Sequence, residues 1–151
     1  MMIATEFVES FMQANKRLKQ PLTVSHLETA IRYLASKPAN TCMSIQPGHS
    51  GYAWSERKVV MVFMWNTGTH IRMRFIKRVS FRNSEIMPGS FKEMRAFPLG
   101  NAMQKLAAWS AADDGTLVAL DAVKPIKKLP SDFFNEDSET DGEVFYHVWA
   151  L

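Results

Sequence analysis

The sequence predicts an α+β domain: an antiparallel β-sheet that includes a long 58–66/69–82 hairpin, with two N-terminal helices and one later helix packed on it. Apolar residues recur at helical spacing before residue 40, and they alternate with polar residues through most of 69–82. Glycine and proline separate these segments. Because 151 residues is a typical single-domain length, residues 1–151 are expected to form one domain, with 129–143 as an acidic loop or linker within it.

Two amphipathic helices are expected at the start of the chain. The first spans about 3–18, and Pro21 ends it. Its apolar stripe comprises Ile3, Phe7, Phe11, Ala14 and Leu18. The second spans about 25–36, where Ser25 and Glu28 have the spacing of a capping box.

Strands are expected to follow the two helices. Residues 59–65 are rich in β-branched and aromatic side chains, and the turn at 66–69 connects them to the alternating stretch 70–82. Further strands are expected at 42–46, 116–120 and 144–151, and a third helix at about 102–111. A parallel βαβ arrangement is the alternative that this order of elements leaves open.

The most informative stretch is the arginine-rich strand of this hairpin. Side chains alternate along a strand, so one face carries the basic residues His70, Arg72, Arg74, Arg78 and Arg82. A hairpin loop of even length is expected to pair residue 65 with 70, 63 with 72, and 61 with 74, which places Trp65 and Phe63 beside the arginines. A loop of three residues would shift the pairing by one residue and remove this arrangement.

Charge is distributed unevenly along the chain. Residues 1–128 hold all 18 Lys and Arg but 9 acids, whereas residues 129–151 hold 6 acids. The window 57–84 has 7 basic residues and no acid, which predicts a basic patch suited to an anionic partner. Two alternatives stay open: the arginines keep an exposed strand soluble, or the acidic segment 132–143 neutralises them within the chain.

No residue pattern indicates a catalytic, metal or cofactor site. The four histidines lack the spacing of zinc ligands, and Cys42 lies among residues typical of a core. The stretch 46–52 is the one that resembles a reactive loop. A small hydrolase or transferase with His49 as general base beside Ser50 is therefore the enzymatic alternative.

These observations favour a non-catalytic macromolecule-binding protein, such as a stoichiometric inhibitor, an adaptor or an immunity-type protein. Its partner would be an acidic protein or nucleic acid, and a homo-oligomer is compatible with the sequence. The predicted partner-binding residues are Arg72, Arg74, Arg78, Arg82, His70, Phe63 and Trp65. In a further alternative the acidic segment 132–143, with Phe133 and Phe134, mimics nucleic-acid charge or docks as a peptide.

The sequence predicts a cytoplasmic protein without a membrane partner. Glu6 and Glu9 interrupt the pattern of a secretory signal, and the longest apolar run, 59–65, has seven residues where a membrane helix needs about 20. A single cysteine permits no internal disulfide, which fits a reducing compartment.

Overall fold

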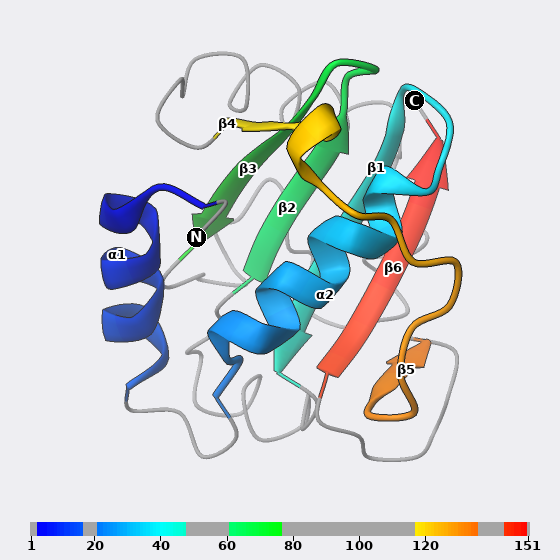
Figure 1. The fold of residues 1–151 in the computed structure, drawn as a ribbon. Coiled ribbons are helices and arrows are strands. Elements are labelled where there is room, and N and C mark those ends of the chain that lie inside the picture. Colours follow the sequence, from blue (N-terminus) through cyan, green and yellow to red (C-terminus); the bar gives the residue numbers. More distant parts are fainter. Residues whose placement is uncertain (1–2, 17–20, 48–60, 77–116, 136–143, 151) are drawn as a thin grey trace, which may run out of the picture.

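A computed structural model describes residues 3–16, 21–47, 61–76, 117–135 and 144–150 as two helices on one face of a six-stranded sheet (Figure 1). The strands are β1 (Thr41–Pro47), β2 (Met61–Asn66), β3 (His70–Ile76), β4 (Leu117–Ala119), β5 (Phe133–Asn135) and β6 (Val144–Ala150). Their spatial order is β4-β3-β2-β1-β6-β5. The predicted α+β class is correct. The antiparallel prediction is wrong for β5 and β6, which pair in parallel, so the sheet is mixed.

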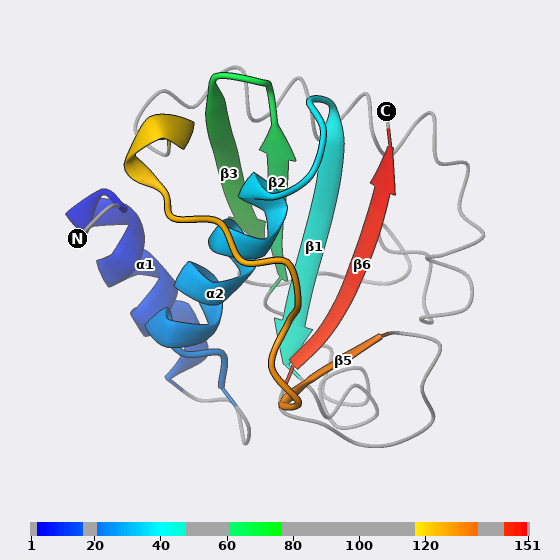
Figure 2. The ribbon, with the colours of Figure 1, turned by 45° about the vertical axis from the view of Figure 1, so that its right-hand side comes forward.

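Both helices lie on the same side of this sheet, as Figures 1 and 2 show from two directions. Helix α1 spans Thr5–Asn15 and α2 spans Val24–Ala35. Their apolar stripes pack on the alternate strand residues that face them. These strand residues are Met43, Ile45, Val62, Met64, Ile71, Met73 and Val144, all 0% exposed. Neither described helix has the length and apolar character needed to cross a bilayer.

The predicted capping box of Ser25 and Glu28 is wrong, because α2 begins at Val24 and Thr23 is its N-cap. The Oγ1 of Thr23 accepts a hydrogen bond from the backbone N–H of His26 at 3.1 Å. In return, Nδ1 of His26 accepts from the backbone N–H of Thr23 at 3.1 Å. A neutral imidazole nitrogen thus takes the part that a glutamate carboxylate plays in the usual capping box.

Asn15 joins the end of α1 to the chain that enters α2. Its side chain is 2% exposed; Nδ2 donates to the carbonyl oxygen of Phe11 at 2.8 Å, and Oδ1 accepts from the backbone N–H of Leu22 at 2.9 Å. Both polar ends of the buried amide are satisfied, as burial requires. Helix α1 therefore ends before residue 18, the end that its apolar stripe predicts.

The hairpin of β2 and β3 turns through two residues, Gly68 and Thr69. Thr67 faces His70 across the turn, with its backbone N–H donating to the carbonyl oxygen of His70 at 2.9 Å. Gly68 has a φ of +98°, as the first central residue of a type II′ turn requires, and a Cβ here would lie 3.2 Å from the Cβ of Ala39. This loop sets the register of the whole hairpin.

The side chain of Asn66 connects this turn to the end of α2. It is 1% exposed, and its Nδ2 donates to the carbonyl oxygens of Leu34 at 3.1 Å and Lys37 at 3.0 Å. Its Oδ1 accepts from the backbone N–H of Gly68 at 2.9 Å. The carbonyl of Leu34 in the last turn of α2 also accepts from the backbone N–H of Lys37 at 3.0 Å, so Asn66 adds a donor to the end of the helix and another to the chain that leaves it.

The segment between β4 and β5 crosses the helical side of the molecule (Figure 1). Arg32 of α2 holds it: Nε donates to the carbonyl oxygen of Lys124 at 2.8 Å, and the carbonyl oxygen of Arg32 accepts from the backbone N–H of Ile126 at 3.1 Å. The segment leads into β5, where Phe133 is 7% exposed in the core. The predicted acidic loop 129–143 therefore contains a short strand.

Several predicted features lie outside the described residues. These are the third helix at 102–111, the hairpin residues 58–60 and 77–82, and the acidic residues 136–143. The hairpin itself is described over Met61–Ile76, and its greater predicted length stays a prediction.

Candidate functional site

The sheet has a second face that points away from the helices. Because side chains alternate along a strand, the neighbours of the core residues lie on this face. Cys42, Phe63 and Phe145 are buried here but take no part in the core beneath the helices. We call the larger ring-bearing and charged members the arginine–aromatic face: Phe63, Trp65, Arg72, Arg74, His147 and Trp149.

Strand pairing arranges these residues in two rows across β3, β2, β1 and β6. The first row contains Arg72, Trp65, Cys42 and Trp149. The second row contains Arg74, Phe63, Ser44 and His147. Neighbouring strands lie about 4.8 Å apart, so each row extends roughly 14 Å from an arginine at one end to a ring at the other.

The members of the two rows differ in exposure. Trp65, Arg72, Arg74, His147 and Trp149 are half-buried, whereas Phe63 is 5% exposed. Phe63 is therefore a buried member of this face and not an exposed anchor. The small side chains Cys42 and Ser44, at 0% and 3% exposed, separate the rings of β2 from those of β6.

Specific contacts hold the outer rings in place. The indole N–H of Trp65 donates to Oδ1 of Asn40 at 3.3 Å. The rings of His147 and Trp149 lie 4.8 Å apart, centroid to centroid, with 34° between their planes. Within the described ranges, the buried atoms Gln46 Oε1 and Trp149 Nε1 of this face have no hydrogen-bond partner, although most buried polar groups in proteins do.

The electrostatic character of the face follows from its composition. The strands Thr41–Pro47, Met61–Asn66, His70–Ile76 and Val144–Ala150 contain two arginines and two histidines but no aspartate or glutamate. These strands therefore contribute positive charge and no carboxylate to this part of the sheet. Guanidinium binds carboxylate and phosphate in a bidentate manner, and it also stacks on aromatic rings.

The structure brings together four of the seven predicted site residues, but in a corrected register. The predicted pairs 65/70, 63/72 and 61/74 are wrong by two residues, because the loop has two residues and not four. Trp65 lies opposite Arg72, and Phe63 lies opposite Arg74. A shift of two keeps every side chain on its face, so the expected grouping is retained.

The other predicted residues are placed as follows. His70 begins β3, and its Nδ1 lies 3.0 Å from Oγ1 of Thr69 beside the turn. Arg78 and Arg82 lie outside the described residues. Sequence reasoning missed His147 and Trp149. Their alternation in 144–150 was the available signal, but only the pairing of β6 with β1 shows that they continue the rows begun by the arginines.

The residues considered for catalysis or metal binding either have other roles or lie outside the described residues. His49 and Ser50 are outside the described residues. His26 has both ring nitrogens engaged, Nδ1 in the helix cap and Nε2 at 3.2 Å from Oδ2 of Asp132, so it fastens α2 to the segment before β5. In the described part of the chain, no group of three or more His, Cys, Asp or Glu is placed to hold a metal ion.

Cys42 is a buried thiol, and burial raises its pKa from 9.0 to about 12. Nucleophilic cysteines have a lowered pKa, so this thiol is not activated. Phe133 is buried as well, which removes one of the two aromatic anchors of the alternative in which the acidic segment docks as a peptide.

The raised pKa of Cys42 predicts a specific loss of stability in alkali. Between about pH 9 and pH 12, only the unfolded chain releases the thiol proton. The free energy of unfolding therefore has its full value below about pH 9 and falls as the pH rises through this interval. We expect the free energy of unfolding of the wild type to decline more steeply than that of Cys42→Ala over this interval. Urea unfolding of both proteins at several pH values measures the difference, and parallel curves would contradict the prediction.

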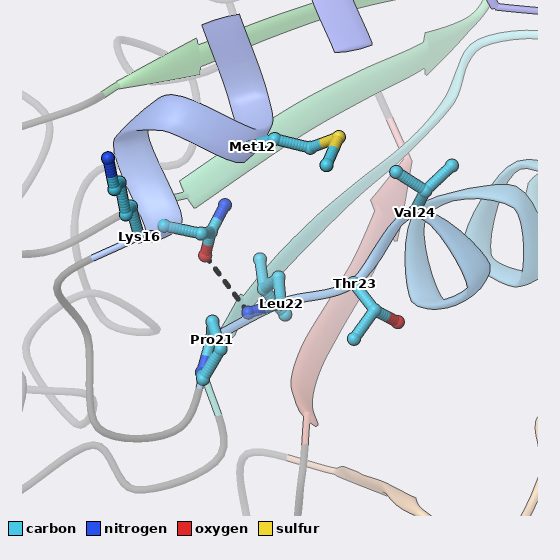
Figure 3. Close-up of a pocket in the computed structure, with 7 residues that line it drawn as sticks. Met12, Lys16, Pro21, Leu22, Thr23 and Val24 are labelled. Atoms are coloured by element: carbon cyan, nitrogen blue, oxygen red, sulfur yellow. Dashed lines mark hydrogen bonds between the residues drawn. The ribbon is translucent and has the colours of Figure 1, made fainter. Parts of the chain in front are cut away.

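A depression of about 260 Å³ lies between the end of α1 and the start of α2 (Figure 3). Met12, Leu22 and Val24 give it an apolar lining, while Lys16 extends away from them. The buried polar group beside it, Asn15, has its hydrogen bonds satisfied by Phe11 and Leu22. The depression therefore lacks the convergent polar groups that orient a ligand in a specific site.

The arginine–aromatic face is thus the strongest candidate in the described residues. Comparison of the chain with models of protein families, with curated proteins and with solved structures finds no match, so this geometry alone supports the proposal that follows.

Proposed function

We propose that this protein is a non-catalytic binding protein whose arginine–aromatic face docks an anionic macromolecule. Arg72 and Arg74 would make the charged contacts, and Trp65 would be the central apolar contact. The observation that carries the proposal is the pair of rows across four strands, each with an arginine at one end and no carboxylate along its strands. Arginine and tryptophan are the residue types that contribute most often to binding energy at interfaces.

The proposed partner is an acidic protein or nucleic acid, and the proposed compartment is the cytoplasm. A single, buried thiol is compatible with a reducing environment. The proposed activities are stoichiometric inhibition, immunity to a toxic partner or adaptor function. Each of them requires binding to the partner and no catalysed reaction.

A matched pair of variants tests the proposal with heparin as the polyanion. Arg72→Ala/Arg74→Ala removes two charges from the face, whereas Lys127→Ala/Lys128→Ala removes two exposed charges from the segment on the helical side. We expect the arginine variant to elute from immobilised heparin at clearly lower salt than the lysine variant, although their net charges are equal. Elution of both at the same salt would mean that binding depends on net charge alone, and the proposal would fail.

A further inference from the structure

His26 has two hydrogen-bond partners that favour opposite protonation states of its imidazole. Nδ1 accepts from the backbone N–H of Thr23, the N-cap of α2, at 3.1 Å. Nε2 lies 3.2 Å from Oδ2 of Asp132, in the segment before β5. We propose that His26 is a pH-sensitive switch: protonation of its ring opens one half of the capping box of α2 and turns the contact with Asp132 into an ion pair. This inference is independent of the proposed function.

The two partners define the tautomer of the neutral ring. A backbone N–H can only donate, so Nδ1 must offer its lone pair to Thr23. The one ring proton of the neutral imidazole then lies on Nε2, which donates it to the carboxylate of Asp132. The neutral ring therefore satisfies both partners at once.

The protonated ring satisfies only one of these two partners. Both nitrogens of an imidazolium carry hydrogen, so Nδ1–H would face the N–H of Thr23, with two donors 3.1 Å apart. This half of the capping box is lost, whereas Oγ1 of Thr23 still accepts from the backbone N–H of His26. Towards Asp132 the effect is opposite, because the imidazolium adds charge attraction to an existing hydrogen bond. Acidification thus loosens the first turn of α2 and strengthens its attachment to the segment before β5.

The packing around the ring holds it between these two contacts. The side chain of His26 is 11% exposed, and its ring lies edge-to-face against that of Phe133, with the centroids 5.7 Å apart. A rotation of the ring away from Thr23 would disturb this packing. The side chain of Asp132 is 37% exposed, so protons from solvent have access to the pair.

Among the charged groups around the ring, Asp132 is in direct contact with it. Glu28 and Arg32 follow the histidine by two and six positions on α2, and these spacings place them on other sides of the helix. Tyr146 of β6 packs against Phe133 with the ring centroids 6.4 Å apart, and burial raises the pKa of its phenol, so it stays neutral in acid. A change of charge on the ring therefore acts first on its two hydrogen-bond partners.

A pH titration of the wild-type protein followed by nuclear magnetic resonance tests the switch. The ring nitrogen shifts of His26 report its tautomer and its protonation, and the backbone amide of Thr23 reports the cap. We expect the neutral ring to carry its proton on Nε2, and the Thr23 amide to shift along the same titration curve as the ring. Protection of this amide against hydrogen exchange should fall about fivefold on protonation of the ring, the factor that corresponds to one lost hydrogen bond.

Two variants separate the contacts of the ring. In His26→Gln, the glutamine can accept from the N-cap N–H as in the usual capping box but does not titrate, so the Thr23 amide should stay unchanged over the same pH range. In Asp132→Asn, an oxygen acceptor is kept and the charge is removed, so the Thr23 amide should still follow the ring.

Three results would overturn the inference. The first is a neutral ring with its proton on Nδ1. The second is a Thr23 amide that does not respond while the ring titrates, or that responds equally in His26→Gln. The third is a ring that stays neutral down to the pH at which acid unfolds the protein.

Discussion

Replacing Phe11 with alanine is expected to lower the free energy of unfolding by roughly 3–5 kcal/mol, the typical loss for a buried phenylalanine. Phe11 is 0% exposed, and it belongs to the core cluster that α1 shares with α2 and the sheet. Its removal leaves a cavity between the helix and the rest of the core. Urea unfolding followed by circular dichroism measures the change.

The adjacent residue supplies the control for this prediction. Met12 occupies the next position of the same helix but is 58% exposed, so Met12→Ala should change stability by no more than about 0.5 kcal/mol. The contrast between the two variants tests whether α1 packs through the face that the structure assigns to it. Equal effects of Phe11→Ala and Met12→Ala would contradict that packing.

Asn66→Ala should be the most destabilising polar substitution in the described chain, with a loss of about 3 kcal/mol. The side chain makes three buried or part-buried hydrogen bonds, each worth about 1 kcal/mol, and its removal takes one donor from the carbonyl of Leu34 and one from that of Lys37. The substitution therefore weakens both the end of α2 and the hairpin turn. Thermal and urea unfolding of the variant measure this loss.

Asn66→Asp separates the two functions of this side chain, because it removes the Nδ2 donor and keeps an oxygen that can accept. The carboxylate still accepts from the N–H of Gly68, but it places negative charge against two carbonyl oxygens at the C-terminus of a helix. We expect it to be no more stable than Asn66→Ala. A loss below about 1 kcal/mol for alanine, or full stability for aspartate, would contradict the role assigned to this residue.

The helices were predictable from sequence because their signals are local. The stripe containing Phe7 and Phe11 identifies α1, and Pro21 follows it closely. The N-cap of α2 was harder to predict than the helix itself, because Thr23 and Ser25 are both residue types that favour this position. The outcome depends on His26, whose ring accepts from the N-cap backbone and also reaches Asp132 from a distant part of the chain.

The sheet was predictable where one turn determines the pairing. Gly68 marked the hairpin, and the face shared by Trp65 and Arg72 followed from the even loop length, although the pairing itself was displaced by two residues. The parallel pairing of β5 with β6 has no local signal, because its partners meet only through the tertiary fold. A three-residue strand within an acidic stretch also lacks the alternation that predicts strands.

Four of the six residues of the arginine–aromatic face could be predicted from the sequence. Arg72, Arg74 and the rings of β2 belong to one hairpin, so local alternation groups them. His147 and Trp149 join them only because β1 lies between β2 and β6, a placement that hydrophobic pattern does not specify. The sequence thus indicated one basic edge of a surface, and the order of the strands extended it across the sheet.

The central claim is that the partner binds the sheet face opposite the helices, and nuclear magnetic resonance tests it most directly. Titration with heparin should shift the indole N–H resonances of Trp65 and Trp149, assigned from their phenylalanine variants. Amide resonances on the exposed side of α1, around Met12, and those of Lys127 should stay in place. Shifts confined to α1 and the Lys127 segment, with both indole resonances unchanged, would contradict the claim.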